Sequence, residues 1–218
     1  MSAGRLRLRT ATALVVLGAP LALAACSPAQ AGAAAVVGPT RITETSLNTD
    51  ATQVNAERAT LHVQPVPGSA LLPVLLQRRV DNTLVAGAAA RLGVVVTPGQ
   101  VDRFIAQYGG LATLQRQLAQ QDATSTQAGA WVAPGRVNET VEVYLLEQGI
   151  GAKLAPGASS TVQGTATYAA LQAEAHAVGV AVSPRYGTWS AKTLTIGPTP
   201  NDLSADAATL GLPAVPAG

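Results

Sequence analysis

Cysteine is almost missing from this sequence. Among 218 residues there is one, Cys26, at the end of an apolar amino-terminal run. A single thiol excludes disulfide bonds within the chain, and the part after Cys26 has no thiolate for catalysis or metal binding. Histidine is nearly as rare, with two residues that are not at metal-ligand spacing. We therefore expect no metal and no other cofactor.

Aromatic residues are also few, seven in all, although 48% of the residues are hydrophobic. The core must then be built mainly from leucine, valine and alanine. Close-packed helices suit these residues, whereas a sheet sandwich draws on β-branched and aromatic side chains. The composition predicts a mainly α fold, and the length suits one ordinary domain with appendages.

The chain carries little net charge. Its formal charge is +2, but Arg5, Arg7 and Arg9 lie in a segment that we expect to be removed. Without them 11 basic residues stand against 12 acidic ones. No basic surface and no interleaving of basic and aromatic residues is present to hold nucleic acid.

Residues 1–26 have the pattern of an export signal, with three arginines before an apolar run that is too short to span a membrane. The run ends in Leu23-Ala24-Ala25-Cys26, which resembles the lipobox of bacterial lipoproteins. That resemblance implies acylation (palmitate) of Cys26 and attachment to the outer face of the cytoplasmic membrane, in the cell envelope. The alternative is an ordinary secreted protein that is cut after an Ala-x-Ala site and leaves Cys26 free.

The remainder divides into three parts. Residues 27–35 form a tether of small residues, 36–196 a folded domain, and 197–218 a tail rich in proline, alanine and glycine that we expect to be disordered.

The stretch from Leu71 to Tyr108 organises the domain and predicts two packed helices. Apolar residues recur every three to four positions up to Leu92, and Pro73 is placed in the first turn. Gly93 ends the first helix, and Thr97-Pro98-Gly99-Gln100 has the form of a capping box that begins the second.

Four further helices are expected. Thr43 caps the first, a short one contains Leu111 to Leu118, one beginning near Val137 closes at Gly149 and Gly151, and the last ends at Gly179. Residues 121–135 and 153–163 are predicted loops.

Two segments read as strands. One is residues 35–43, with a Gly-Pro turn inside it, and the other is residues 180–189. Since neither has a local partner, we expect them to pair with each other. The predicted fold is therefore mainly α, with about five to six helices and a small two-stranded sheet that joins the two ends of the domain. Tyr186 and Trp189 should then lie against the long helix.

These pieces in this order resemble the SurA family of envelope chaperones and foldases, specifically its N-terminal domain. The resemblance is carried by Val36-Val37-Gly38 with Arg41-Ile42-Thr43, by the segment from Arg79 to Thr97, and by Val182-Ser183-Pro184-Arg185-Tyr186-Gly187-Thr188-Trp189. This last ending is similar to that of actinobacterial lipoproteins of the family. Members with enzyme activity insert a parvulin prolyl-isomerase domain before the last helix. Here a loop takes that place, so the resemblance implies a peptide-binding module that is not an enzyme.

Other reactive residues have structural interpretations. His62 is expected to be solvated and His176 to suit a helix end. The carboxylates Glu139, Glu142 and Glu147 are expected to form a solvated helix face, opposite an apolar face with Val137, Val141 and Tyr144. Trp131 lies in a small polar segment, either as a lid on the core or as an exposed contact. The candidate partner-binding residues are Trp131, Tyr186 and Trp189, and no catalytic or metal site is predicted.

The sequence thus favours a membrane-anchored, chaperone-like lipoprotein that binds unfolded or extended polypeptides. The alternative is a non-chaperone lipoprotein that docks one defined envelope partner. An enzyme is the third and weakest hypothesis, because no convergent set of reactive groups is present.

Overall fold

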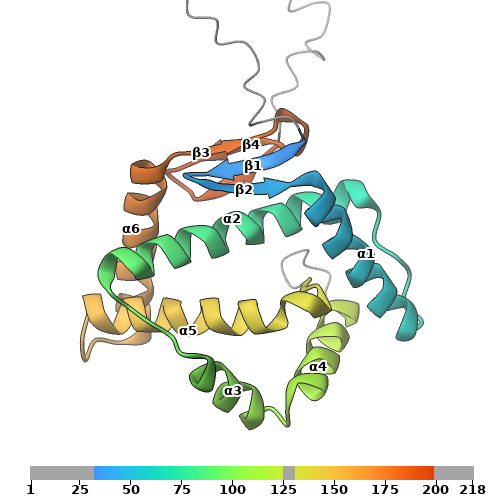
Figure 1. Cartoon of the computed structure of the whole chain (residues 1–218), viewed down its shortest axis with the longest axis horizontal. Coiled ribbons are helices and arrows are strands. Elements are labelled where there is room, and N and C mark those ends of the chain that lie inside the picture. Colours follow the sequence, from blue (N-terminus) through green and yellow to red (C-terminus); the bar gives the residue numbers. More distant parts are fainter. Residues whose placement is uncertain (1–31, 125–130, 199–218) are drawn as a thin grey trace, which may run out of the picture. The chain divides into compact units, whose positions relative to one another are not determined.

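We describe residues 32–124 and 131–198 of a computed structural model (Figure 1). The domain is mainly helical, as the sequence predicts, and it contains two small antiparallel sheets where one was expected. Its helices are α1 (Glu44–Thr60), α2 (Gly68–Leu92), α3 (Pro98–Gln107), α4 (Leu111–Thr124), α5 (Val137–Leu154) and α6 (Ser160–Val178). Its strands are β1 (Ala33–Val37), β2 (Thr40–Thr43), β3 (Val180–Val182), β4 (Thr188–Ser190) and β5 (Thr195–Gly197).

The larger sheet joins the two ends of the domain, in the order β2-β1-β3. Ala35 is paired with Val182 and Val37 with Val180, so the expected pairing of the two distant segments is confirmed for residues 180–182. Residues 188–190 of the second segment pair instead with β5. The sheet has a third strand because residues 35–43 form a hairpin and not a single strand. Strand β1 begins at Ala33, inside the predicted tether. The predicted export signal lies outside the described residues. Of the predicted tail, Gly197 belongs to β5 and the part beyond Pro198 lies outside the described residues.

The smaller sheet is a hairpin of β4 and β5, which the sequence did not predict. Gly187 precedes β4 with a φ of +129°, and a Cβ atom there would collide with the carbonyl oxygen of Gly197. Only glycine fits such a position without strain. Tyr186 and Trp189 are half-buried against the same core that contains the first turns of α2, as expected.

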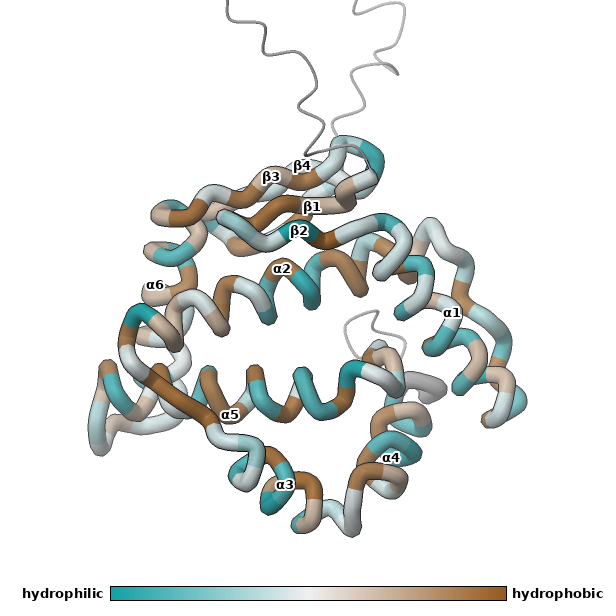
Figure 2. The backbone as a smooth tube through the Cα atoms, viewed as in Figure 1, coloured by the Kyte–Doolittle hydropathy of each residue, from teal (hydrophilic) through white to brown (hydrophobic). Residues whose placement is uncertain are grey.

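The link between α2 and α3 agrees closely with the prediction from the sequence. Gly93 has a φ of +65°, and the Val94 N–H donates to the Ala89 carbonyl at 2.8 Å, which closes α2. The Thr97 N–H donates to Gln100 Oε1 at 2.7 Å, which confirms the capping box. Figure 2 shows the link itself as a hydrophobic stretch. Helix α2 begins at Gly68, however, so Pro73 lies inside the helix and not in its first turn.

Three predicted boundaries are wrong. Helix α5 continues through Gly149 and Gly151 to Leu154, because these glycines allow close packing and do not end the helix. A Cβ at Gly149 would lie 2.6 Å from Val94 Cγ1, and one at Gly151 would lie 3.0 Å from Gln163 Cβ on α6. The loop before α6 is therefore only residues 155–159, and α4 extends to Thr124 into the other predicted loop.

Helix α2 forms the centre of the domain. In Figure 1 the larger sheet lies on one side of α2 and α5 on the other. Residues of α2 are shared between the core under the sheet and a second core against α5 and α6. Its fully buried side chains include Leu71, Leu76, Val80, Leu84 and Val85. Every other element is thus positioned by its contact with α2 or with a neighbour of α2.

Candidate functional site

A groove of about 670 Å³ lies between α2, α5 and strand β5. Its walls carry the apolar side chains of Val74, Val143 and Ile196, and its polar lining includes Gln77 and Asp81. A concave surface with apolar walls and few polar groups is the usual form of a binding site in a small domain. Among the hollows of the described residues we regard this groove as the best candidate site.

Exposed aromatic residues gather at one side of the groove. Tyr144 on α5 lines it and is 45% exposed. Its ring centroid lies 5.4 Å from that of Phe104 on α3, which in turn lies 5.0 Å from Tyr108, also 45% exposed. Tyrosine offers a large contact area at a small loss of side-chain entropy, and it is enriched at sites of protein binding. Two exposed tyrosines and half-buried Phe104, three of the seven aromatics in the chain, thus form one cluster on this surface.

Two carboxylates from different helices line the same groove. Burial raises the pKa of Asp81 from 3.8 to about 6, against the lowering effect of a hydrogen bond from Gln77, and the charge of Glu147 raises it further. Burial also raises the pKa of Glu147. The groove therefore holds two acidic groups that are partly removed from water and that repel one another.

Gln77 joins the groove floor to strand β5. Its Nε2 donates to Asp81 Oδ1 at 2.8 Å and to the Leu194 carbonyl at 2.9 Å. Its Oε1 accepts from the Ile196 N–H at 2.7 Å. The side-chain amide of Gln77 thus forms hydrogen bonds with the backbone groups at the edge of β5 that faces α2.

A second hollow of about 540 Å³ lies between α5 and α6. Glu147 lines both this hollow and the groove, so the two adjoin at that residue. Tyr168 is 42% exposed and also lines the second hollow, and its hydroxyl donates to the Lys192 carbonyl at 3.2 Å. The turn between β4 and β5 is thereby held against α6.

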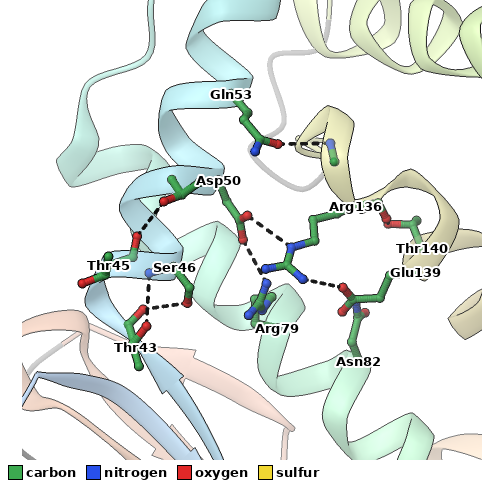
Figure 3. A network of polar contacts seen from close by, with 12 residues as sticks. Thr43, Thr45, Ser46, Asp50, Gln53, Arg79, Asn82, Arg136, Glu139 and Thr140 are labelled. Atoms are coloured by element: carbon green, nitrogen blue, oxygen red, sulfur yellow. Dashed lines mark hydrogen bonds and ion pairs between the residues drawn. The ribbon is translucent and has the colours of Figure 1, made fainter.

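A network of charged groups holds the elements around the groove in place (Figure 3). Asp50 on α1 is only 4% exposed. Its carboxylate accepts from Arg79 Nη1 at 3.1 Å and from Arg136 Nε at 3.2 Å. Arg136 also donates to Glu139, which in turn accepts from Asn82 on α2, both at 3.0 Å. The network fixes α1, α2 and the start of α5 relative to one another, and its role is structural.

The three predicted partner-binding residues do not come together in the groove. Trp131 is 8% exposed and belongs to the main core. This agrees with the expectation of a lid on the core, and it leaves no exposed ring to contact a partner. Trp189 lies within strand β4 of the smaller sheet and Tyr186 lies just before that strand, and both are half-buried. The guanidinium of Arg185 lies 5.9 Å from the centroid of the Tyr186 ring. Cys26 lies outside the described residues.

Three residues of α5 depart from expectation. Glu139 is half-buried in the charged network and Glu147 is partly buried in the groove, whereas the sequence predicts a solvated face for both. Tyr144, which the sequence places on the apolar face, is exposed and lines the groove. His62 ends α1 with a φ of +57°, and His176 lies in the last turn of α6.

Asp81, Gln77 and Tyr144 were not identified as site residues from the sequence. Gln77 and Asp81 are four residues apart on a helix, a spacing that places them on one face, but nothing in the sequence indicates what that face meets.

In the described part of the chain, no group of three metal-ligating side chains is found. The helices of that part also include none long and apolar enough to cross a bilayer. In comparisons with known proteins, no family model, no curated protein and no solved structure matches the chain.

Proposed function

We propose that this protein is a lipid-anchored envelope protein whose helical domain binds extended segments of other polypeptides, in the manner of a chaperone and without isomerase activity. The observation that carries the proposal is the groove between α2, α5 and β5, with exposed Tyr144 on its wall. An open, apolar-walled groove bordered by helices is a common way to hold an extended or helical peptide.

Two features support the choice of a binding module. The resemblance to the SurA N-terminal domain implies a peptide-binding module. The catalytic insert of that family has no counterpart between α5 and α6, because these helices are joined by residues 155–159 alone. The adjoining hollow between α5 and α6 extends the surface along which a chain can lie.

Replacing Tyr144 with serine is expected to weaken binding of an unfolded polypeptide about fivefold, because an aromatic contact is worth about 1 kcal/mol. The measurement is fluorescence anisotropy of a labelled, permanently unfolded protein with the purified domain. Tyr108→Ser is the matched control, since Tyr108 has the same exposure and also contacts Phe104 but does not line the groove.

If both variants and the wild type bind the unfolded polypeptide with equal affinity, the binding site lies elsewhere than in the groove. No binding at tens of micromolar protein, together with recovery of one stoichiometric partner by crosslinking in cells, would replace the chaperone-like function with docking of a single envelope protein.

Replacing Cys26 with serine is expected to release the protein from the membrane fraction or to leave an uncleaved precursor. A single acyl chain binds a bilayer only marginally, but the two or three expected on a lipoprotein cysteine anchor a protein firmly. Fractionation of cells and metabolic labelling with palmitate measure this effect. A Cys26→Ser variant that fractionates, migrates and labels like the wild type would contradict lipidation at Cys26. Ser27→Ala is the control, because it changes a neighbouring side chain but keeps the thiol.

A further inference from the structure

Four other buried or half-buried acids of the described residues are paired with arginine, whereas half-buried Glu57 and the two acidic groups of the groove are not. Asp50 pairs with two arginines, Glu174 with Arg91, Glu139 with Arg136 and Glu44 with Arg185. Within residues 32–124 and 131–198, no ion pair reaches Asp81 or Glu147. The hydrogen bond that Asp81 accepts comes from the neutral amide of Gln77.

A carboxylate that is taken out of water without a cation raises the free energy of the folded state, and the raised pKa values of Asp81 and Glu147 express that cost. Arg78 is the cationic residue of the groove lining, and its charge lowers the pKa of Asp81 less than burial and Glu147 raise it. At neutral pH the lining thus has two negative groups and one positive group. The site is electrostatically suited to receive one more cation.

The apolar walls restrict which cation fits. Val74, Val143 and Ile196 offer aliphatic surface beside the carboxylates. Lysine and arginine combine an aliphatic stem with a charged end, and they bury the first while the second keeps polar contacts. A small inorganic cation would leave the apolar walls unused.

The edge of β5 excludes one common mode of peptide binding. An extended chain adds to a sheet through the free backbone groups of the edge strand. The Ile196 N–H and the Leu194 carbonyl, which face α2, are already occupied by Gln77. A bound polypeptide must therefore be recognised in this groove mainly through its side chains.

We propose that the groove holds an extended polypeptide through a lysine or arginine side chain, whose stem packs on Val74, Val143 and Ile196 and whose charged end lies between Asp81 and Glu147. This inference rests on the proposed function and names the feature of the polypeptide that the site selects.

Three labelled peptides of ten residues test the proposal. They are identical except at one central position, which is lysine, norleucine or glutamate. Norleucine keeps the lysine stem and removes the charge, so it separates apolar packing from charge recognition. Binding to the mature domain is measured by fluorescence anisotropy at pH 7.5. We expect the lysine peptide to bind about tenfold more tightly than the norleucine peptide, and the glutamate peptide to bind most weakly.

Asp81→Asn and Glu147→Gln remove the two charges with little change in shape, and each is expected to reduce the preference for lysine over norleucine to threefold or less. Glu142→Gln is the matched control, because Glu142 is exposed on the same helix and does not line the groove. Circular dichroism confirms that each variant is folded. At pH 5 the wild type is also expected to lose most of the lysine preference, since Asp81 is then largely protonated. Arg78 is the other charged side chain of the groove lining.

The failure of this inference is distinguishable from failure of the proposed function. Equal binding of the lysine and norleucine peptides overturns the inference but leaves peptide binding in place. A lysine preference that Glu142→Gln reduces as much as Glu147→Gln also overturns it, because the effect is then one of overall charge. If none of the three peptides binds, the proposed function itself is wrong for this groove.

Discussion

Replacing Asp50 with alanine is expected to lower the free energy of unfolding by about 3–5 kcal/mol, the usual cost of removing one partner from a buried ion pair. Asp50 is the shared acceptor of Arg79 and Arg136, and the Arg79 side chain is only 18% exposed. Without the carboxylate, the Arg79 guanidinium lies between α1 and α2 with no counter-charge at that point. Because Arg136 is 35% exposed and can turn toward water, most of the loss comes from Arg79.

Urea denaturation of Asp50→Ala and of a matched control measures this effect. Glu139→Ala is the control, because Glu139 belongs to the same network but is 36% exposed. The loss of such an exposed pair is worth under about 1 kcal/mol. Unfolding midpoints that fall equally in both variants would show that burial of Asp50 does not determine the energetics of the network.

Replacing Asp81 with asparagine is expected to stabilise the domain, whereas the Asp50 replacement destabilises it. We expect the free energy of unfolding at pH 7.5 to rise by up to about 3 kcal/mol. In the folded domain the pKa of Asp81 is about 6, against an ordinary value of 3.8. Above pH 6 the carboxylate is charged in both states, and only the folded state bears the cost of burying the charge. Asparagine is neutral and retains the oxygen that accepts from Gln77.

The pH dependence gives the stronger test. Between pH 6 and pH 4 the folded wild type takes up the proton before the unfolded chain does, so its stability rises relative to the variant. The difference between the two proteins should therefore shrink as the pH falls and vanish below about pH 4. Urea midpoints at pH 7.5, 6, 5 and 4 measure it. A difference that is constant over this range, or a variant that is less stable at pH 7.5, would contradict the burial of a charged Asp81.

The local elements could be predicted because their signals are local. Gly93 at a helix end and Thr97 followed by proline and Gln100 each determine a backbone conformation within a few residues. The closure of the domain was predicted because no local partner was recognised for either strand segment. The pairing of β1 with β3 agrees with that prediction, although β1 also has a local partner in β2.

The groove could not be predicted, because it depends on how helices approach one another. The sequence does not distinguish a glycine that ends a helix from a glycine that allows another element to pack closely against the helix. Gly149 is of the second kind. Tyr144 and Glu147 lie on one helix at positions that sequence periodicity assigns to the core and to solvent. In the folded domain the first is exposed in the groove and the second is partly buried there.

The pairing of β1 with β3 also determines an order of events during biosynthesis. A chain that emerges amino end first presents β1 and β2 long before β3 exists, and a two-stranded hairpin alone is marginal in water. Helices α2 and α3 with their link depend on nearby residues and form early, whereas the sheet requires closure of a loop that contains all six helices. Until that moment one edge of β1 lacks the hydrogen bonds that β3 supplies, although its buried residues Ala34 and Val37 belong to a core that α2 also forms. We therefore expect the sheet to be completed last, and the newly made chain to present an unpaired strand edge for the whole time that the helices take to assemble.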